Sequence, residues 1–188
     1  SKIGSKQKIY SKKLNNALNK EKEINAQSYR NFNLRLENVK TIINHFFDTC
    51  KNKKIIGYGA STKGNIILNH SKITNKKLKM ICDGNKQKWG RYTPGSNIKI
   101  ISKEKMRRLK PDFLFVLIWS FRSEVIRQEI KFLKRGGKLV FPLPIFHIID
   151  NQSYHVQQQY DFWNNCVSLS AYLLHSTADV CSFVGSGG

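Results

Sequence analysis

Between residues 54 and 144, short apolar runs alternate with stretches in which apolar residues recur every three or four positions. Short apolar runs predict buried strands, and the longer spacing predicts helices. The strands fall at 55–58, 78–82, 98–101, 113–119 and 138–141, and the helices at 61–69, 102–109 and 124–135. Because strands and helices alternate, we expect an α/β domain with an open, mostly parallel sheet and helices on both faces.

Two segments flank this region. Residues 1–53 begin with a Lys- and Asn-rich stretch, where we expect a frayed helix or tail, and continue into an amphipathic helix from residue 29 to residue 50. After Asn151 there is no basic residue, and residues 180–188 resemble a strand that stops at a glycine turn. We therefore divide the chain into a basic N-terminal helical segment (1–53), an α/β domain (54–150) and an unassigned tail (151–188).

Composition excludes several classes of protein. No apolar run reaches the length of about 18 residues that a membrane-spanning helix needs, and the first residues lack the apolar segment of a secretory signal. We expect a cytoplasmic chain without membrane contact. The four cysteines are scattered, which indicates neither a zinc site nor a disulfide framework.

The chain is strongly basic, with 33 Lys and Arg against 12 Asp and Glu and a net charge of +21. Such a charge attracts polyanions, so binding of nucleic acid with steep salt dependence is one hypothesis. The excess consists mostly of Lys in the company of many Asn and Ile, a mixture that compositional drift of the coding sequence also produces. We therefore do not expect nucleic acid to be the partner.

The sharpest motif is GYGASTKGN at 57–65, where the first strand meets a helix. Glycines there allow a tight turn, and the N–H groups of a helix N-terminus bind phosphate or carboxylate. Thr62 occupies the place of the third glycine of a dinucleotide fingerprint, and the P-loop pattern is absent. Two interpretations stay open: an open corner that receives an anion with help from Lys63, or glycines required for strand–helix packing alone.

A second group follows the second strand. Asp83 stands where nucleotide-binding α/β folds hold a hydroxyl-binding carboxylate, although Asp-Gly-Asn is also a common turn sequence. Arg91 is suited to bidentate phosphate binding, with support from Lys88. Trp89 and Tyr92 are suited to stacking a base. The alternative is a solvated basic loop.

Trp119 and Glu124 lie at the carboxyl end of the central apolar strand, the edge at which open α/β sheets bind ligands. Core packing explains Trp119 about as well. No histidine has a partner at metal-ligand or triad spacing, and no paired carboxylates stand out, so we assign no catalytic residue.

Taken in order, four motifs resemble the C-terminal domain of the S-adenosylmethionine-dependent sugar C-methyltransferases. They are GYGASTKGN at 57–65, CDGNKQKWGRYTPGS at 82–96, PDFLFVLIWSFRSE at 111–124 and GGKLVFPLP at 136–144, within a resemblance that spans about residues 29–149. It implies a Rossmann-like domain that helps to hold a nucleotide-linked deoxysugar. The family's zinc-binding and methyltransferase domains have no counterpart in this chain, so we expect neither S-adenosylmethionine nor zinc to bind to this chain alone.

The resemblance implies substrate-binding residues and a partner, a methyltransferase domain on a missing segment or a neighbouring chain. Those residues are Gly59, Ala60, Lys63, Gly64, Asn65, Asp83, Asn85, Lys88, Gly90, Arg91, Trp119 and Glu124. Two alternatives stay open: a stand-alone Rossmann-like enzyme that binds S-adenosylmethionine or a nucleotide, and a basic nucleic-acid-binding domain.

Overall fold

The computed structural model describes residues 2–22 and 24–153, so the strand predicted at 180–188 lies outside the described residues. The chain divides into two compact units that meet between Asn38 and Val39. In the first unit, α1 (Lys2–Lys22) is a continuous helix, and α2 (Ala26–Thr49) begins behind Asn25, whose side chain accepts the N–H of Gln27 at 2.9 Å. Among the described helices, none combines the length and the apolar character needed to cross a bilayer.

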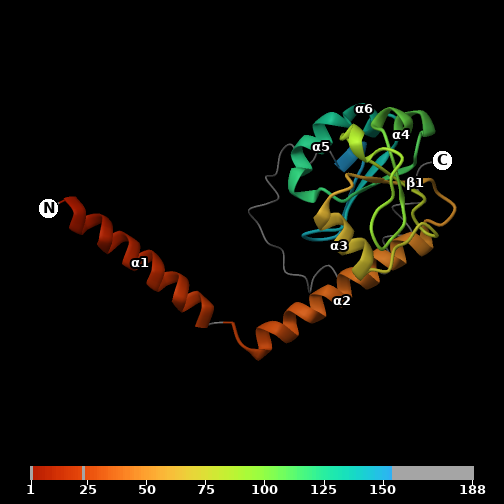
Figure 1. The fold of residues 1–188 in the computed structure, drawn as a ribbon. Coiled ribbons are helices and arrows are strands. Elements are labelled where there is room, and N and C mark those ends of the chain that lie inside the picture. The colour runs from red at the N-terminus through yellow and green to blue at the C-terminus, as the bar shows by residue number, and fades with distance from the viewer. Residues whose placement is uncertain (1, 23, 154–188) are drawn as a thin grey trace. The chain divides into compact units, whose positions relative to one another are not determined.

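The second unit holds a six-stranded sheet in the order β3-β2-β1-β4-β5-β6. In Figure 1 the sheet is the group of arrows around the label β1, with helices packed beside it. Neighbouring strands from β3 to β5 are parallel, and β6 is antiparallel to β5. This arrangement confirms the α/β, Rossmann-like fold predicted from the sequence. The strands are β1 (Ile55–Tyr58), β2 (Met80–Cys82), β3 (Lys99–Ile101), β4 (Phe113–Val116), β5 (Lys138–Phe141) and β6 (His147–Ile149).

Helices cover both faces of the sheet. The chain moves from β1 to β3 in one direction and then crosses to β4 and β5 in the other. Because such crossovers are right-handed, the helices before and after this reversal lie on opposite faces. The apolar side chains of α3 join one core cluster, and those of α4, α5 and α6 join the other. The helix bounds are α3 (Thr62–His70), α4 (Lys103–Leu109), α5 (Arg122–Gln128) and α6 (Ile130–Leu133).

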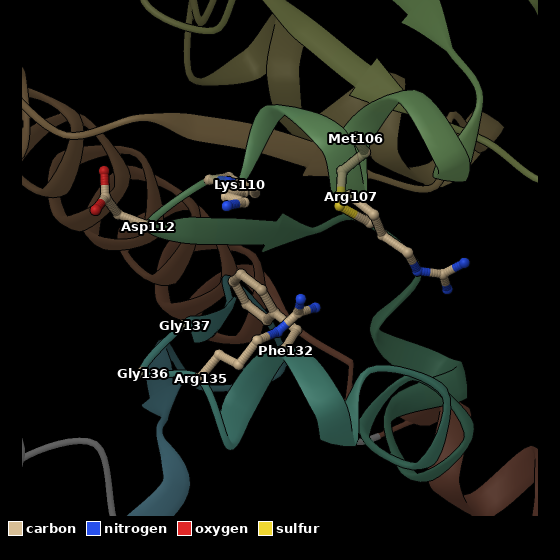
Figure 2. A pocket seen from close by; sticks show the side chains of 9 residues that line it. Met106, Arg107, Lys110, Asp112, Phe132, Arg135, Gly136 and Gly137 are labelled. Carbon is tan, nitrogen blue, oxygen red and sulfur yellow. The ribbon is translucent and has the colours of Figure 1, made fainter.

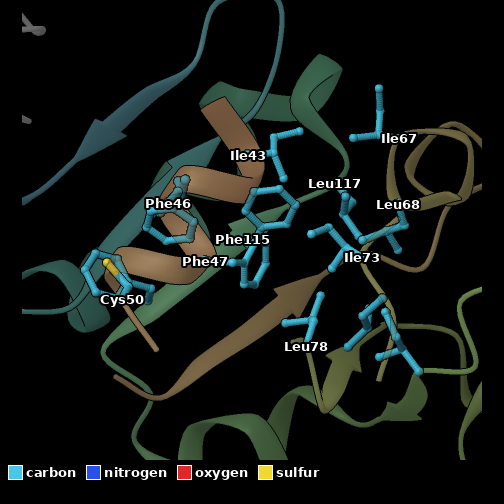
Figure 3. Close-up of a cluster of buried hydrophobic side chains, with 14 of the residues drawn as sticks. Ile43, Phe46, Phe47, Cys50, Ile67, Leu68, Ile73, Leu78, Phe115 and Leu117 are labelled. Atoms are coloured by element: carbon cyan, nitrogen blue, oxygen red, sulfur yellow. The ribbon is translucent and has the colours of Figure 1, made fainter. Parts of the chain in front are cut away.

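The end of α2 fills the face of β4 and β5 that no later helix can reach. The Phe46 ring lies edge-on to Phe113 with centroids 5.4 Å apart, and Phe47 lies edge-on to Phe115 at 5.2 Å. Figure 3 shows the Phe46, Phe47 and Phe115 rings gathered with Ile43 in one cluster. The α/β unit therefore includes residues 39–53, which the sequence interpretation had assigned to the N-terminal segment.

Two predicted elements differ most from the structure, and one observed strand was not predicted. The strand predicted over 113–119 ends at Val116 and is followed by a 3₁₀ turn (Trp119–Phe121), because Leu117 and Trp119 owe their apolar character to core packing beyond the sheet. The helix predicted over 124–135 begins at Arg122 and is interrupted at Glu129. Strand β6 was not predicted, since its three residues follow two prolines and carry no periodicity of their own. A further 3₁₀ turn covers Lys86–Lys88.

Candidate functional site

The glycine-rich motif forms a tight corner between β1 and α3. Gly59 has a φ of +89°, and a Cβ there would lie 2.6 Å from the Ile118 side chain. A Cβ on Gly64 would lie 2.7 Å from Leu117 Cβ. Ser61 caps α3 by accepting the Gly64 N–H at 3.0 Å, and its hydroxyl donates to the Leu117 carbonyl at 3.2 Å. Both glycines are thus required for the corner to pack against the end of β4.

Asp83 ties this corner to the loop that follows β2. Its Oδ2 accepts the Ala60 N–H at 2.8 Å, and its Oδ1 accepts the Asn85 N–H at 2.8 Å. The Lys88 ammonium donates to the Ala60 carbonyl at 2.9 Å and to Asp83 Oδ2 at 3.2 Å. The Trp89 indole N–H donates to the Asp83 carbonyl at 2.8 Å. Several of the predicted site residues therefore form one connected network with Trp89.

This network changes the role expected for the corner. The Ala60 N–H, a position expected to face a bound anion, already has the Asp83 carboxylate as its acceptor. Both carboxylate oxygens are engaged by the chain itself, so Asp83 secures the corner in the structure rather than presenting a free acceptor to a ligand hydroxyl. The Trp89 ring packs against the apolar core and uses its N–H internally, which leaves Tyr92, 55% exposed, as the loop's accessible aromatic ring.

Several groups stay available beside the closed corner. The backbone N–H groups of Thr62 and Lys63 have no acceptor among the described residues, as expected for the first turn of a helix. The side chains of Lys63 and Arg91 are exposed, and neither forms an ion pair within the part of the chain that the structure describes. Asn65 Oδ1 is a buried acceptor without a donor in this same part.

The loop after β2 runs along α3. It is anchored at the corner by Lys88, and further on the Asn69 side-chain amide donates to the Pro94 carbonyl at 3.2 Å. Between these anchors, Gly90 adopts a φ of +81° and donates its N–H across to β3. Arg91 also lies between the anchors, and its carbonyl accepts a β3 N–H at 2.8 Å. Arg91 is therefore held on a backbone that hydrogen bonds to β3 fix in place.

Trp119 and Glu124 do not join this network. Trp119 is partly buried and packs against both apolar clusters, in agreement with the core-packing alternative. Glu124 is exposed on the first turn of α5 and accepts the side-chain amide of Gln128 at 2.7 Å. Neither side chain contacts the corner through a hydrogen bond or ion pair among the described residues.

A buried polar cluster that the sequence analysis missed lies on the opposite face of β1. Glu129, 2% exposed, accepts a hydrogen bond from the Tyr58 hydroxyl at 3.2 Å and pairs with Arg107 at 2.7 Å. Burial, reinforced by the Glu129 charge, raises the pKa of Tyr58. Lys103 lies over the Tyr58 ring at 4.7 Å. The signal in the sequence was a glutamate on the apolar side of a predicted helix.

His147, the first residue of β6, is a partly buried titratable group next to the carboxyl end of β5. Its Nδ1 is 2.8 Å from the Ile145 carbonyl, and its Nε2 accepts a hydrogen bond from Arg122 Nε at 3.2 Å. These contacts assign the proton to Nδ1. Burial, with a further contribution from the Arg122 charge, lowers the pKa of His147. Among the described residues, no three His, Cys, Asp or Glu side chains gather as a metal site would require.

The fold and the corner define a Rossmann-like α/β domain, and sequence comparison identifies its family. Residues 2–144 match the sequence profile of the C-methyltransferase C-terminal domain. The chain therefore belongs to the family of C-methyltransferase C-terminal domains.

A named relative supports this assignment. The C-methyltransferase NovU from Streptomyces niveus is 32% identical to the chain over 127 residues, which are 66% of this chain and 30% of that protein. The chain thus spans less than a third of the length of the relative that it matches.

Proposed function

We propose that this chain is the part of a sugar C-methyltransferase that holds the nucleotide-sugar substrate. Family membership supports a place in a C-methyltransferase. Within that framework, the network of Ala60, Asp83 and Lys88 supports the proposal, because it ties the start of α3 to the loop after β2. Trp119 and Glu124 lie outside this network. The S-adenosylmethionine site and the catalytic groups belong, in this proposal, to another domain.

The observation that carries the proposal is the set of unpartnered groups beside the Asp83 network. Two backbone N–H groups of the first α3 turn and the two exposed cations Lys63 and Arg91 offer donors and positive charge to a pyrophosphate. The buried Asn65 Oδ1 lacks a donor within the described residues, and a sugar or ribose hydroxyl would supply one. The network itself fixes the backbone on which these groups stand.

Such a module contributes to the reaction through orientation. A substrate held at both its pyrophosphate and a hydroxyl presents its sugar carbon to the methyl donor in a restricted geometry, which lowers the entropic part of the barrier. In the described network the Asp83 carboxylate accepts three hydrogen bonds from the chain itself, which supports a structural role for this group. The proposal therefore assigns binding and positioning to this chain and no proton transfer.

The test is isothermal titration of the chain with thymidine and uridine diphosphate-sugars. We expect saturable binding, and we expect Lys63→Ala and Arg91→Ala each to raise the dissociation constant about tenfold, as for the loss of one charged hydrogen bond. Lys105→Ala and Arg108→Ala are the matched controls, since both are exposed cations of α4, on the other face of the sheet. They should bind the ligand like the unmodified chain.

Other outcomes identify a different function. A folded chain that shows no heat at millimolar nucleotide-sugar contradicts the proposal. Saturable binding of S-adenosylmethionine instead would favour the stand-alone enzyme. Binding of DNA that weakens steeply with salt and ignores sugar identity would favour the nucleic-acid alternative.

A further inference from the structure

A cavity of about 370 Å³ lies at the opposite edge of the sheet, where β4 and β5 begin. Its walls come from the end of α4, the connection to β4, the end of α6 and the glycine turn before β5. The lining residues are Met106, Arg107, Lys110, Pro111, Asp112, Phe132, Arg135, Gly136 and Gly137. A volume of this size falls within the range of small-molecule sites in proteins, about 300–1,000 Å³. The cavity is separate from the groups assigned to the nucleotide-sugar.

The local sequence creates this cavity by ending two helices next to each other. Lys110 takes the left-handed conformation, with a φ of +46°, and Pro111 prevents α4 from continuing. Gly136 ends the other helix with a φ of +87°. Gly137 leaves room for the Phe132 ring, which a Cβ at that position would strike. The Phe132 ring and the buried Met106 side chain therefore give the cavity an apolar floor.

The walls carry more cationic than anionic side chains. Figure 2 shows Lys110 on the α4 side and Arg135 on the α6 side, with the Phe132 ring between them. Neither cation has a carboxylate partner within residues 24–153. Arg107, by contrast, is paired with the buried Glu129, and its guanidinium lies toward one end of the cavity in Figure 2, with the Asp112 carboxylate at the other.

We propose that this cavity binds a small organic anion whose charge is carried on an apolar ring. The ring would lie on the Phe132 and Met106 floor, and the carboxylate or phosphate would face the Lys110 and Arg135 side chains at the walls. A bare inorganic anion would leave the apolar floor exposed, and a cation would meet two positive side chains. Both the floor and the charge are therefore needed for recognition.

The test is titration of the ¹⁵N-labelled chain with phenyl phosphate, benzoate, inorganic phosphate and benzyl alcohol, followed by NMR. We expect phenyl phosphate and benzoate to shift the amide signals of residues 110, 136 and 137 saturably, and the ratio of their affinities to show which anion the site prefers. Inorganic phosphate and benzyl alcohol should bind at least tenfold more weakly. Amide signals of residues 59–65 report independently on the proposed nucleotide-sugar site.

Two variants test whether Lys110 and Arg135 are the cations that bind the anion. Arg135→Gln and Lys110→Asn should each raise the dissociation constant for phenyl phosphate about tenfold, and asparagine tolerates the left-handed backbone at position 110. Arg108→Gln and Lys131→Gln are controls from the same two helices, and they should leave the affinity unchanged. Such contacts should give a dissociation constant of roughly 20 mM or lower, so the proposal is overturned if no saturable shift occurs up to about that ligand concentration. It is also overturned if benzyl alcohol binds as well as the anions, or if the control variants weaken binding as much as Arg135→Gln.

Discussion

Replacing Asp83 by asparagine should destabilise the α/β unit, because an amide has one acceptor oxygen where the carboxylate has two. In the structure, Oδ2 accepts the Ala60 N–H and the Lys88 ammonium, while Oδ1 accepts the Asn85 N–H. The substituted side chain would keep a single acceptor oxygen and would turn an NH₂ group toward a donor on the other side. Either the corner or the turn after β2 would lose its acceptor.

The size of the effect follows from these contacts. A hydrogen bond to a charged group contributes about 1.5–3 kcal/mol, and the Asp83 side chain is 13% exposed, so solvent screens it little. The Lys88 partner is 40% exposed and adds at most about 1 kcal/mol. We expect Asp83→Asn to lower the free energy of unfolding by about 2–3 kcal/mol.

Urea denaturation followed by circular dichroism measures this change. With a slope near 2 kcal/mol/M, the midpoint should fall by about 1–1.5 M. Asp48→Asn is the control: its ion pair to Lys77 is shorter, at 2.6 Å, but Asp48 is 65% exposed, so its loss should cost no more than about 1 kcal/mol. If Asp83→Asn unfolds at the same urea concentration as the unmodified chain, or if Asp48→Asn costs as much, the stabilising role given to Asp83 is wrong.

Three further outcomes are expected. Phe46→Ala should lower the free energy of unfolding by about 3–5 kcal/mol, whereas Phe32→Ala on the same helix, 51% exposed in the unmodified chain, should change it by about 0.5 kcal/mol or less in urea titrations. Because the pKa of His147 is lowered in the fold, its contribution to stability is present above the unfolded value of 6.5 and is lost as pH falls below it. Unfolding measured at pH 7.5 and 5.5 should therefore show a loss of stability at the lower pH that is smaller in His147→Asn. Burial raises the pKa of the Cys82 thiol to about 12, so a pulse of iodoacetamide at pH 8 should modify Cys82 in urea and spare it in the folded chain, as mass spectrometry of its peptide would show.

Much of the fold was predictable because each strand of the parallel sheet is buried on both faces. A run such as Phe113–Val116 is apolar throughout, and caps such as Ser102 mark where the next helix begins. Elements set by tertiary contacts were harder. At the interruption, the buried Glu129 side chain contacts Tyr58 and Arg107, which are distant in sequence and leave no local pattern.

The N-terminal boundary of the α/β unit was also set by tertiary contacts and could not be predicted from local pattern. The apolar stripe that includes Ile43 and Phe46 indicated that this helix packs on another element, but periodicity does not identify the surface. The sheet topology identifies that surface. Right-handed crossovers confine α4, α5 and α6 to one face, so the other face of β4 and β5 must be covered by an element from outside the alternating strands and helices. The last turns of α2 provide this cover.

The candidate site shows where spacing stops being informative. A carboxylate after β2 and glycines after β1 meet in any fold of this topology, because both follow carboxyl ends of adjacent strands. The topology therefore brings Asp83 close to Ala60. Spacing did not predict that Asp83 would bind groups of its own chain instead of a ligand. The Ala60 N–H and the Lys88 ammonium compete with any dissolved ligand for the Asp83 carboxylate, and they do so at a far higher local concentration. A ligand of this corner must accordingly be recognised by groups that the network leaves unpaired, which makes Lys63 and Arg91, rather than Asp83, the decisive positions for binding experiments.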